Sequence, residues 1–219
     1  MKLDDEFDLS PLSATVLENA ERVLGDARIL FDAGSYATAC ALACVSIEEA
    51  GKACLILWRD KGLIKRDIAK DVRDHHAKHR VFAGLKEALS FVPLLTEKMD
   101  ADDLARRIET EVLDPNRESS FLAKLGAFDA FKQYGFYVDV DDQTHFQPTK
   151  VIYRKDAEYL LAEASQAIVL VKEVPAVHFV ACGMYLEEEA PKRDPKMMRE
   201  IRELMASRKV RPAIPENQS

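Results

Sequence analysis

The stretch from Arg73 to Arg80 holds the densest set of residues that could move protons or bind phosphate. It reads Arg-Asp-His-His-Ala-Lys-His-Arg and contains three of the five histidines in the chain. A histidine exchanges protons near neutral pH, because its ordinary pKa is about 6.5. A neighbouring arginine or lysine can hold a phosphate and stabilise its developing negative charge. The candidate catalytic residues are therefore Arg73, His75, Lys78 and His79, with Asp74 and His76 in support.

Two other interpretations of this stretch remain open. A run of charged residues is most often a solvated helix face. His75 and His79 are four residues apart and line one helical face, so they could also bind a metal together with a carboxylate such as Asp71 or Glu48. The glutamate expected inside a zinc-protease motif is missing, however. The sequence therefore predicts no metal and no cofactor.

A second cluster, Ile47-Glu48-Glu49-Ala50-Gly51-Lys52, lies within an almost wholly apolar segment. Glu48 and Lys52 share a helical face. They could form an ordinary surface pair that contributes ~0.3–0.5 kcal/mol. Alternatively they are buried, and buried charges need partners. The nearest dense set of complementary groups is the stretch 73–80, so we expect Glu48 and Lys52 to face it, with Glu49 in the same supporting network.

Apolar residues at helical spacing predict the elements that position these clusters. The segment 36–58, rich in alanine and cysteine, is expected to be the central buried helix. Pro93 and Pro175 are expected to end helices. Tyr137 and Asp139 fall in an extended segment and could line a pocket. The remaining predicted helices span 12–33, 66–91, 97–112, 117–134, 155–173 and 196–208. The fold class is therefore all-α: an antiparallel bundle with a short extended, β-hairpin-like insertion near 136–153.

Composition limits the possible functions. A length of 219 residues suits one domain, expected over residues 1–211, and the polar tail 212–219 is expected to be disordered. The net charge of −7 argues against a broad nucleic-acid groove but allows a small basic site. No stretch approaches the ~20 apolar residues of a membrane helix. The acidic N-terminus does not resemble a signal peptide. We therefore expect a cytoplasmic protein that uses no membrane.

Cysteine usage agrees with that compartment. The four cysteines form no C-x-x-C pair, and three of them fall inside one apolar helical pattern. They are expected to be small buried thiols, not disulfides or zinc ligands. They are Cys40, Cys44, Cys54 and Cys182.

These motifs, in this order, resemble the AbiV family of abortive-infection proteins within the HEPN superfamily. The resemblance covers roughly residues 12–173. It rests on Gly34-Ser35-Tyr36-Ala37-Thr38-Ala39, on Ile47-Glu48-Glu49-x-Gly51-Lys52, on Asp74-His75-x-x-Lys78, and on Lys132-x-x-Gly135-Phe136-Tyr137-Val138-Asp139. It implies an α-helical bundle, often dimeric, that defends bacteria against phage.

The resemblance also implies a possible activity. Many HEPN proteins are metal-independent ribonucleases with an arginine followed, after four to six residues, by a histidine. Arg73 and His79 fit this spacing, with five residues between them, whereas the AbiV-type element centres on His75 and Lys78. In this first hypothesis His75 or His79 takes the proton of an RNA 2′-hydroxyl, while Arg73 and Lys78 hold the phosphate. A homodimer would bring the 73–80 segments of two chains together.

The second hypothesis is a non-catalytic defence protein that binds a phage protein or interferes with translation. The same charged residues would then form a structural network or a recognition surface. Geometry discriminates between the two hypotheses. Convergence of Glu48, Lys52, His75 and His79 in an open cleft would favour the enzyme, and a buried, mutually paired network would favour the binding protein.

Overall fold

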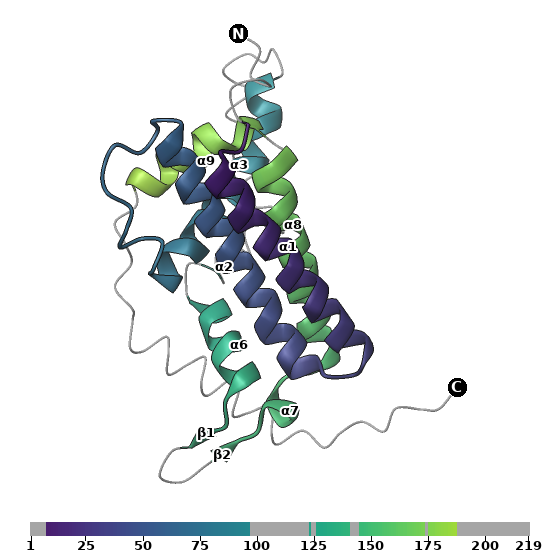
Figure 1. Ribbon diagram of the computed structural model, residues 1–219. Coiled ribbons are helices and arrows are strands. Elements are labelled where there is room, and N and C mark those ends of the chain that lie inside the picture. Colours follow the sequence, from purple (N-terminus) through teal and green to yellow (C-terminus); the bar gives the residue numbers. More distant parts are fainter. Residues whose placement is uncertain (1–7, 97–122, 124–125, 141–144, 174, 188–219) are drawn as a thin grey trace.

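The computed structural model describes residues 8–96, 123, 126–140, 145–173 and 175–187, and these confirm the all-α class (Figure 1). A two-strand hairpin interrupts the helices, with Asp139 paired antiparallel to Phe146. It lies within the predicted extended insertion. The elements in chain order are α1 (Pro11–Asp32), α2 (Tyr36–Asp60), α3 (His75–Thr96), α6 (Ala127–Phe136), β1 (Asp139–Val140), β2 (His145–Phe146), α7 (Pro148–Val151), α8 (Arg154–Glu173) and α9 (Pro175–Glu187).

Helix α2 is the centre of the bundle, as its composition predicts. Helices α1, α3, α6 and α8 all pack against it (Figure 1). Its small side chains, among them Ala43 and Ala50, are fully buried. Small residues let neighbouring helices approach on several sides, so one helix can serve as the core for four others. All four cysteines are free and buried, in agreement with the expectation of buried thiols.

The reversal between α1 and α2 follows the local chemistry of its residues. Gly34 has a φ of +77°, a left-handed conformation that glycine adopts without steric cost. Ser35 occupies the N-cap position of α2, but its side chain makes no capping hydrogen bond to the helix. At the other end of α1, Ser10 does cap the helix, because its hydroxyl accepts from the backbone N–H of Ser13.

Helix α3 differs from its predicted span of 66–91 at both ends. It begins at His75, because the carboxylate of Asp74 accepts a hydrogen bond from the backbone N–H of His76 at 2.9 Å and caps the helix. The preceding residues form turns that bury Ile64 and Ile68. The helix then continues through Pro93, which removes only one backbone hydrogen bond. The predicted stop at Pro93 was therefore wrong.

Three further predictions need correction. The predicted helix 117–134 is interrupted at Gly126, whose φ of +75° precedes α6. Part of the second segment expected to be extended, Pro148–Val151, forms the short helix α7, whereas Ile152 directly after it is extended. Pro175 does end α8, but it also begins α9, which was not predicted although proline suits the first turn of a helix. Helices 97–112 and 196–208, the domain limit at 211 and the tail 212–219 lie outside the described residues.

Helix α9 is held to the bundle by a buried histidine. The indole N–H of Trp58 donates to Nδ1 of His178 at 3.2 Å, and Nε2 of His178 donates to the carbonyl of Val171 at 3.1 Å. Burial lowers the pKa of His178 to about 4, despite that backbone hydrogen bond. The ring is therefore neutral at pH 7 and links α9 to α2 and α8. In the described part of the chain, no single helix is long and apolar enough to cross a membrane. The bent pair Arg154–Lys172 and Val177–Leu186 would together be long and apolar enough, by length and composition alone.

Candidate functional site

The carboxylate of Glu48, in the middle of α2, is the centre of a compact cluster of basic groups. Only 4% of Glu48 is exposed. One oxygen lies 2.5 Å from Nδ1 of His75 and 3.2 Å from Nζ of Lys78. The other lies 2.5 Å from Nζ of Lys132 and 3.6 Å from Nε2 of His79. Two helices, α3 and α6, thus supply four basic side chains to one carboxylate.

Two glycines explain how α3 and α6 come so close to α2. A Cβ added at Gly51 of α2 would lie 2.5 Å from the carbonyl oxygen of Lys78, far inside van der Waals contact. A Cβ added at Gly135 of α6 would lie 2.6 Å from the carbonyl oxygen of Ala37. Any larger residue would push the helices apart, so these glycines set the distance at which Lys78 and Lys132 reach Glu48.

The surrounding positive charge keeps Glu48 ionised. Burial alone would raise the pKa of this carboxyl, but the charge of protonated His79, the hydrogen bond from Lys132 and the charge of Lys78 lower it to about 2. Burial alone would lower the pKa of Lys132. Its hydrogen bonds to Glu48 and Asp129 outweigh burial, so the pKa of Lys132 is raised overall. At neutral pH the two lysines supply the compensation, because His79 is then neutral. The cluster is a buried ion network with fixed charge.

His79 lies too deep to contact a substrate. Its side chain is fully buried, and burial lowers its pKa to about 4. Neither ring nitrogen has a hydrogen-bond partner within the described residues, and the ring packs edge-on against Phe128. His79 is therefore a neutral core residue at pH 7. His75 and His79 are four residues apart, so both rings lie near the carboxylate of Glu48, but only the ring of His75 reaches the surface.

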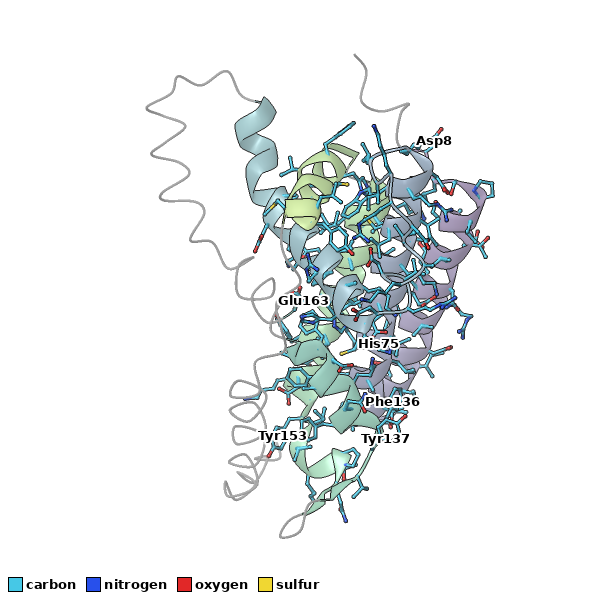
Figure 2. The ribbon with its side chains drawn as sticks, turned by 90° about the vertical axis from the view of Figure 1, so that its left-hand side faces the viewer. Asp8, His75, Phe136, Tyr137, Tyr153 and Glu163 are labelled. Carbon is cyan, nitrogen blue, oxygen red and sulfur yellow. The ribbon has the colours of Figure 1, made fainter. Side chains whose placement is uncertain are left out.

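His75 is the histidine that reaches solvent, and 53% of its side chain is exposed (Figure 2). Its Nδ1 also lies 3.2 Å from Nζ of Lys132 and 3.5 Å from Nζ of Lys78. The ionised carboxylate of Glu48 can only accept hydrogen bonds, so Nδ1 of His75, 2.5 Å from it, carries the proton and donates. This tautomer leaves Nε2 with a free lone pair. A carboxylate that fixes a histidine in this way prepares it to act as a base.

The other predicted polar residues lie around this centre, and one expectation was wrong. Lys52 does not face the stretch 73–80: it pairs with Glu49 at 2.8 Å, and Glu49 also accepts from Asn19 of α1 at 3.1 Å. These two residues thus form a separate, partly buried pair that is linked to α1 through Asn19. Arg73 is exposed in the turn before α3, and Asp74 caps that helix.

The remaining sites predicted from the sequence are His76, Tyr137 and Asp139. The ring of His76 lies near Gly126, 3.9 Å from where a Cβ would stand. Tyr137 is 62% exposed at the end of α6, so its ring lies on the surface. Asp139 belongs to β1, where its backbone pairs with the second strand. Lys132 was not predicted as a site residue, although the motif Lys132-x-x-Gly135 contained the signal.

Comparison with known proteins identifies the family of this chain. A family model described as AbiV, of the HEPN type, matches residues 9–168. The chain belongs to the AbiV family. The match includes all the residues around Glu48, whereas α9 lies beyond it. No curated protein and no solved structure matches the chain significantly. Membership of AbiV points to a role in abortive infection.

Within the described ranges, no group of three histidine, cysteine or acidic residues could hold a metal ion.

Proposed function

We propose that this AbiV protein is an anti-phage defence factor that cleaves RNA without a metal, with His75 as the general base. The observation that carries the proposal is the pairing of an exposed imidazole with a buried, ionised carboxylate. Nδ1 of His75 is held by Glu48, and more than half of the side chain faces solvent. This is the geometry that a base for a 2′-hydroxyl needs, because only the outer nitrogen must reach the substrate.

The chemistry balances with groups that this site and water provide. Nε2 of His75 takes the proton of the 2′-hydroxyl, and the 2′-oxygen attacks the adjacent phosphorus. The bond from phosphorus to the 5′-oxygen breaks, and that oxygen takes a proton from water. The products are a 2′,3′-cyclic phosphate and a 5′-hydroxyl. We assign the phosphate contact to Arg73, which is exposed two residues before His75, and the N-terminus of α3 favours the same negative charge.

Lys78 has a different role here from the one expected. Its side chain is 7% exposed and its Nζ is paired with Glu48, so it holds the carboxylate instead of the phosphate. Lys132 does the same from α6. Both lysines are positioning residues, because they act on substrate only through Glu48 and His75.

A non-catalytic binding role is the second candidate, and one observation favours it. Four of the five groups in the cluster are buried, and the two lysines among them are paired with Glu48, which is the arrangement expected of a structural network. Breaking such a network would disturb the fold whether or not RNA is cleaved. A protein partner, such as a phage protein, would then be recognised elsewhere on the surface.

The two roles are separated by incubating the purified protein with total RNA in the presence of EDTA. We expect cleavage by the wild-type protein and loss of cleavage in His75→Ala and in the shape-conserving His75→Gln. The control is Arg22→Ala, whose side chain is 63% exposed on α1 and, among the described residues, pairs only with neighbours on that helix. Circular dichroism verifies that each variant is folded. Equal cleavage by wild-type protein and both His75 variants would refute the assignment.

A further inference from the structure

At the end of α6, one helical turn beyond Lys132, the surface carries two exposed aromatic rings in sequence. Phe136 is the last residue of α6 and is 40% exposed, and Tyr137, directly after it, is 62% exposed. Val138 continues the apolar surface at 55% exposure. Exposed apolar residues in a contiguous group usually mark a binding surface.

Helix α6 links these rings to the site. Phe136 follows Lys132 by four residues and therefore lies one helical turn away on the same face. Nζ of Lys132 lies 3.2 Å from Nδ1 of His75. Figure 2 shows His75, Phe136 and Tyr137 following one another toward the end that carries the β-hairpin. A chain bound at His75 can therefore continue across the two rings.

From this arrangement we propose that Phe136 and Tyr137 form a stacking platform for unpaired bases of single-stranded RNA, next to His75. The inference deepens the proposed ribonuclease function and rests on it. Phosphate contacts alone provide little affinity here. The chain has a net charge of −7, and the two lysines of the site are committed to Glu48 and Asp129. Base stacking does not depend on that charge, because it uses the flat face that every base has.

The geometry of the rings also selects the form of the RNA. Their centroids are 6.2 Å apart, and their planes meet at 67°. One base therefore cannot lie flat on both rings, so they receive two successive bases or one base by its face and its edge. Bases in a duplex have no free faces, because they stack on their neighbours. The platform thus favours loops, bulges and single strands.

Binding is measured with a labelled single-stranded oligonucleotide and the full-length chain carrying His75→Ala, so that cleavage does not intervene. In this background we expect Phe136→Ala and Tyr137→Ala each to raise the Kd for RNA by about tenfold. Tyr137→Phe keeps the ring and should keep the affinity. Phe179→Ala is the matched control, because Phe179 is also 40% exposed but belongs to α9. The same oligonucleotide in a duplex should bind more weakly.

Each outcome bears on the platform separately from the nuclease. No RNA binding at all, or equal binding by the Phe136 and Tyr137 variants and the control, overturns the platform even if the wild-type protein cleaves RNA. Binding that depends on both rings supports the platform, even if the wild-type protein cleaves nothing and the nuclease proposal fails. Light scattering on the same variants is the last check. A change from dimer to monomer on removing either ring would show that the rings contact a second copy of the chain, and would overturn RNA as their partner.

Discussion

The carboxylate of Glu48 lies 2.5 Å from Nδ1 of His75, although 27 residues separate them in the chain. This contact joins the central helix to the first residue of α3 and connects a buried charge to an exposed ring. Stability and any chemistry at His75 therefore depend on the same carboxylate. The first prediction concerns that carboxylate.

Glu48→Gln should lower the free energy of unfolding by about 3–5 kcal/mol, because it leaves the ammonium groups of Lys78 and Lys132 buried without their counter-ion. Urea unfolding followed by circular dichroism measures the loss. Glu49→Gln is the matched control on the same helix. Its pair with Lys52 is partly exposed, so its loss should cost less than about 1 kcal/mol. Similar losses for the two variants would contradict a central role for Glu48.

Gly51→Ala should destabilise the protein by about 1–3 kcal/mol, since its methyl group would meet the carbonyl oxygen of Lys78 at 2.5 Å. Gly25→Ala, in the middle of α1, is the opposite case. Nothing lies within 4 Å of its Cβ position, so the change should stabilise the protein by about 0.5–1 kcal/mol. Thermal melting of both variants tests the close approach of α2 and α3. A melting temperature unchanged in Gly51→Ala would show that the helices can separate freely.

Ala43→Leu should overpack the core around α2 and cost about 1–3 kcal/mol, because Ala43 is fully buried. The control, Ala162→Leu, adds the same atoms to an exposed position on α8. Differential scanning calorimetry should show a lower melting temperature only for Ala43→Leu. If the two variants melt together, α2 is not packed as tightly as we describe.

Stability should fall as the pH drops from about 6.5 toward 4. Burial lowers the folded-state pKa of both His79 and His178 to about 4, whereas in the unfolded chain each titrates near 6.5. Between these values the unfolded state binds more protons, so each histidine removes about 1.4 kcal/mol per pH unit. Glu48, with a pKa lowered to about 2, adds a further loss below about pH 4.5. Urea titrations at pH 7 and pH 5 measure the difference. His79→Gln should reduce it, and an unchanged difference would show that His79 is not neutral in the folded protein.

We also predict a homodimer in which the 73–80 segments approach each other, since one exposed Arg73 and one exposed His75 provide few groups for phosphate chemistry. Two-fold symmetry would double both at one place. Chromatography with light scattering should give about twice the chain mass of 24.7 kDa. A monomer at micromolar concentration would rule out shared catalysis.

Much of this architecture follows from local pattern. The apolar spacing before Gly34, the small residues of 36–58 and the periodic segment 155–173 predict α1, α2 and α8 to within a few residues. Chemistry-bearing residues can be found in the same way, because the clusters at Glu48 and at His75 are dense in the sequence. Where local signals compete, the prediction fails. A capping aspartate moved the start of α3, Pro93 did not end that helix, and the proline that ends α8 also begins α9.

The tertiary structure alone decided how deeply each site residue is buried and which distant residues pair with one another. Helical spacing puts His75 and His79 on one face, but only the packing of α3 leaves one ring half exposed and buries the other. Nothing local predicts that Lys132, 84 residues from Glu48, provides its second ammonium, or that Lys52 turns to Glu49 instead. These outcomes depend on how closely three helices approach. That distance is set where a Cβ at Gly51 or Gly135 would collide with the backbone of a neighbouring helix.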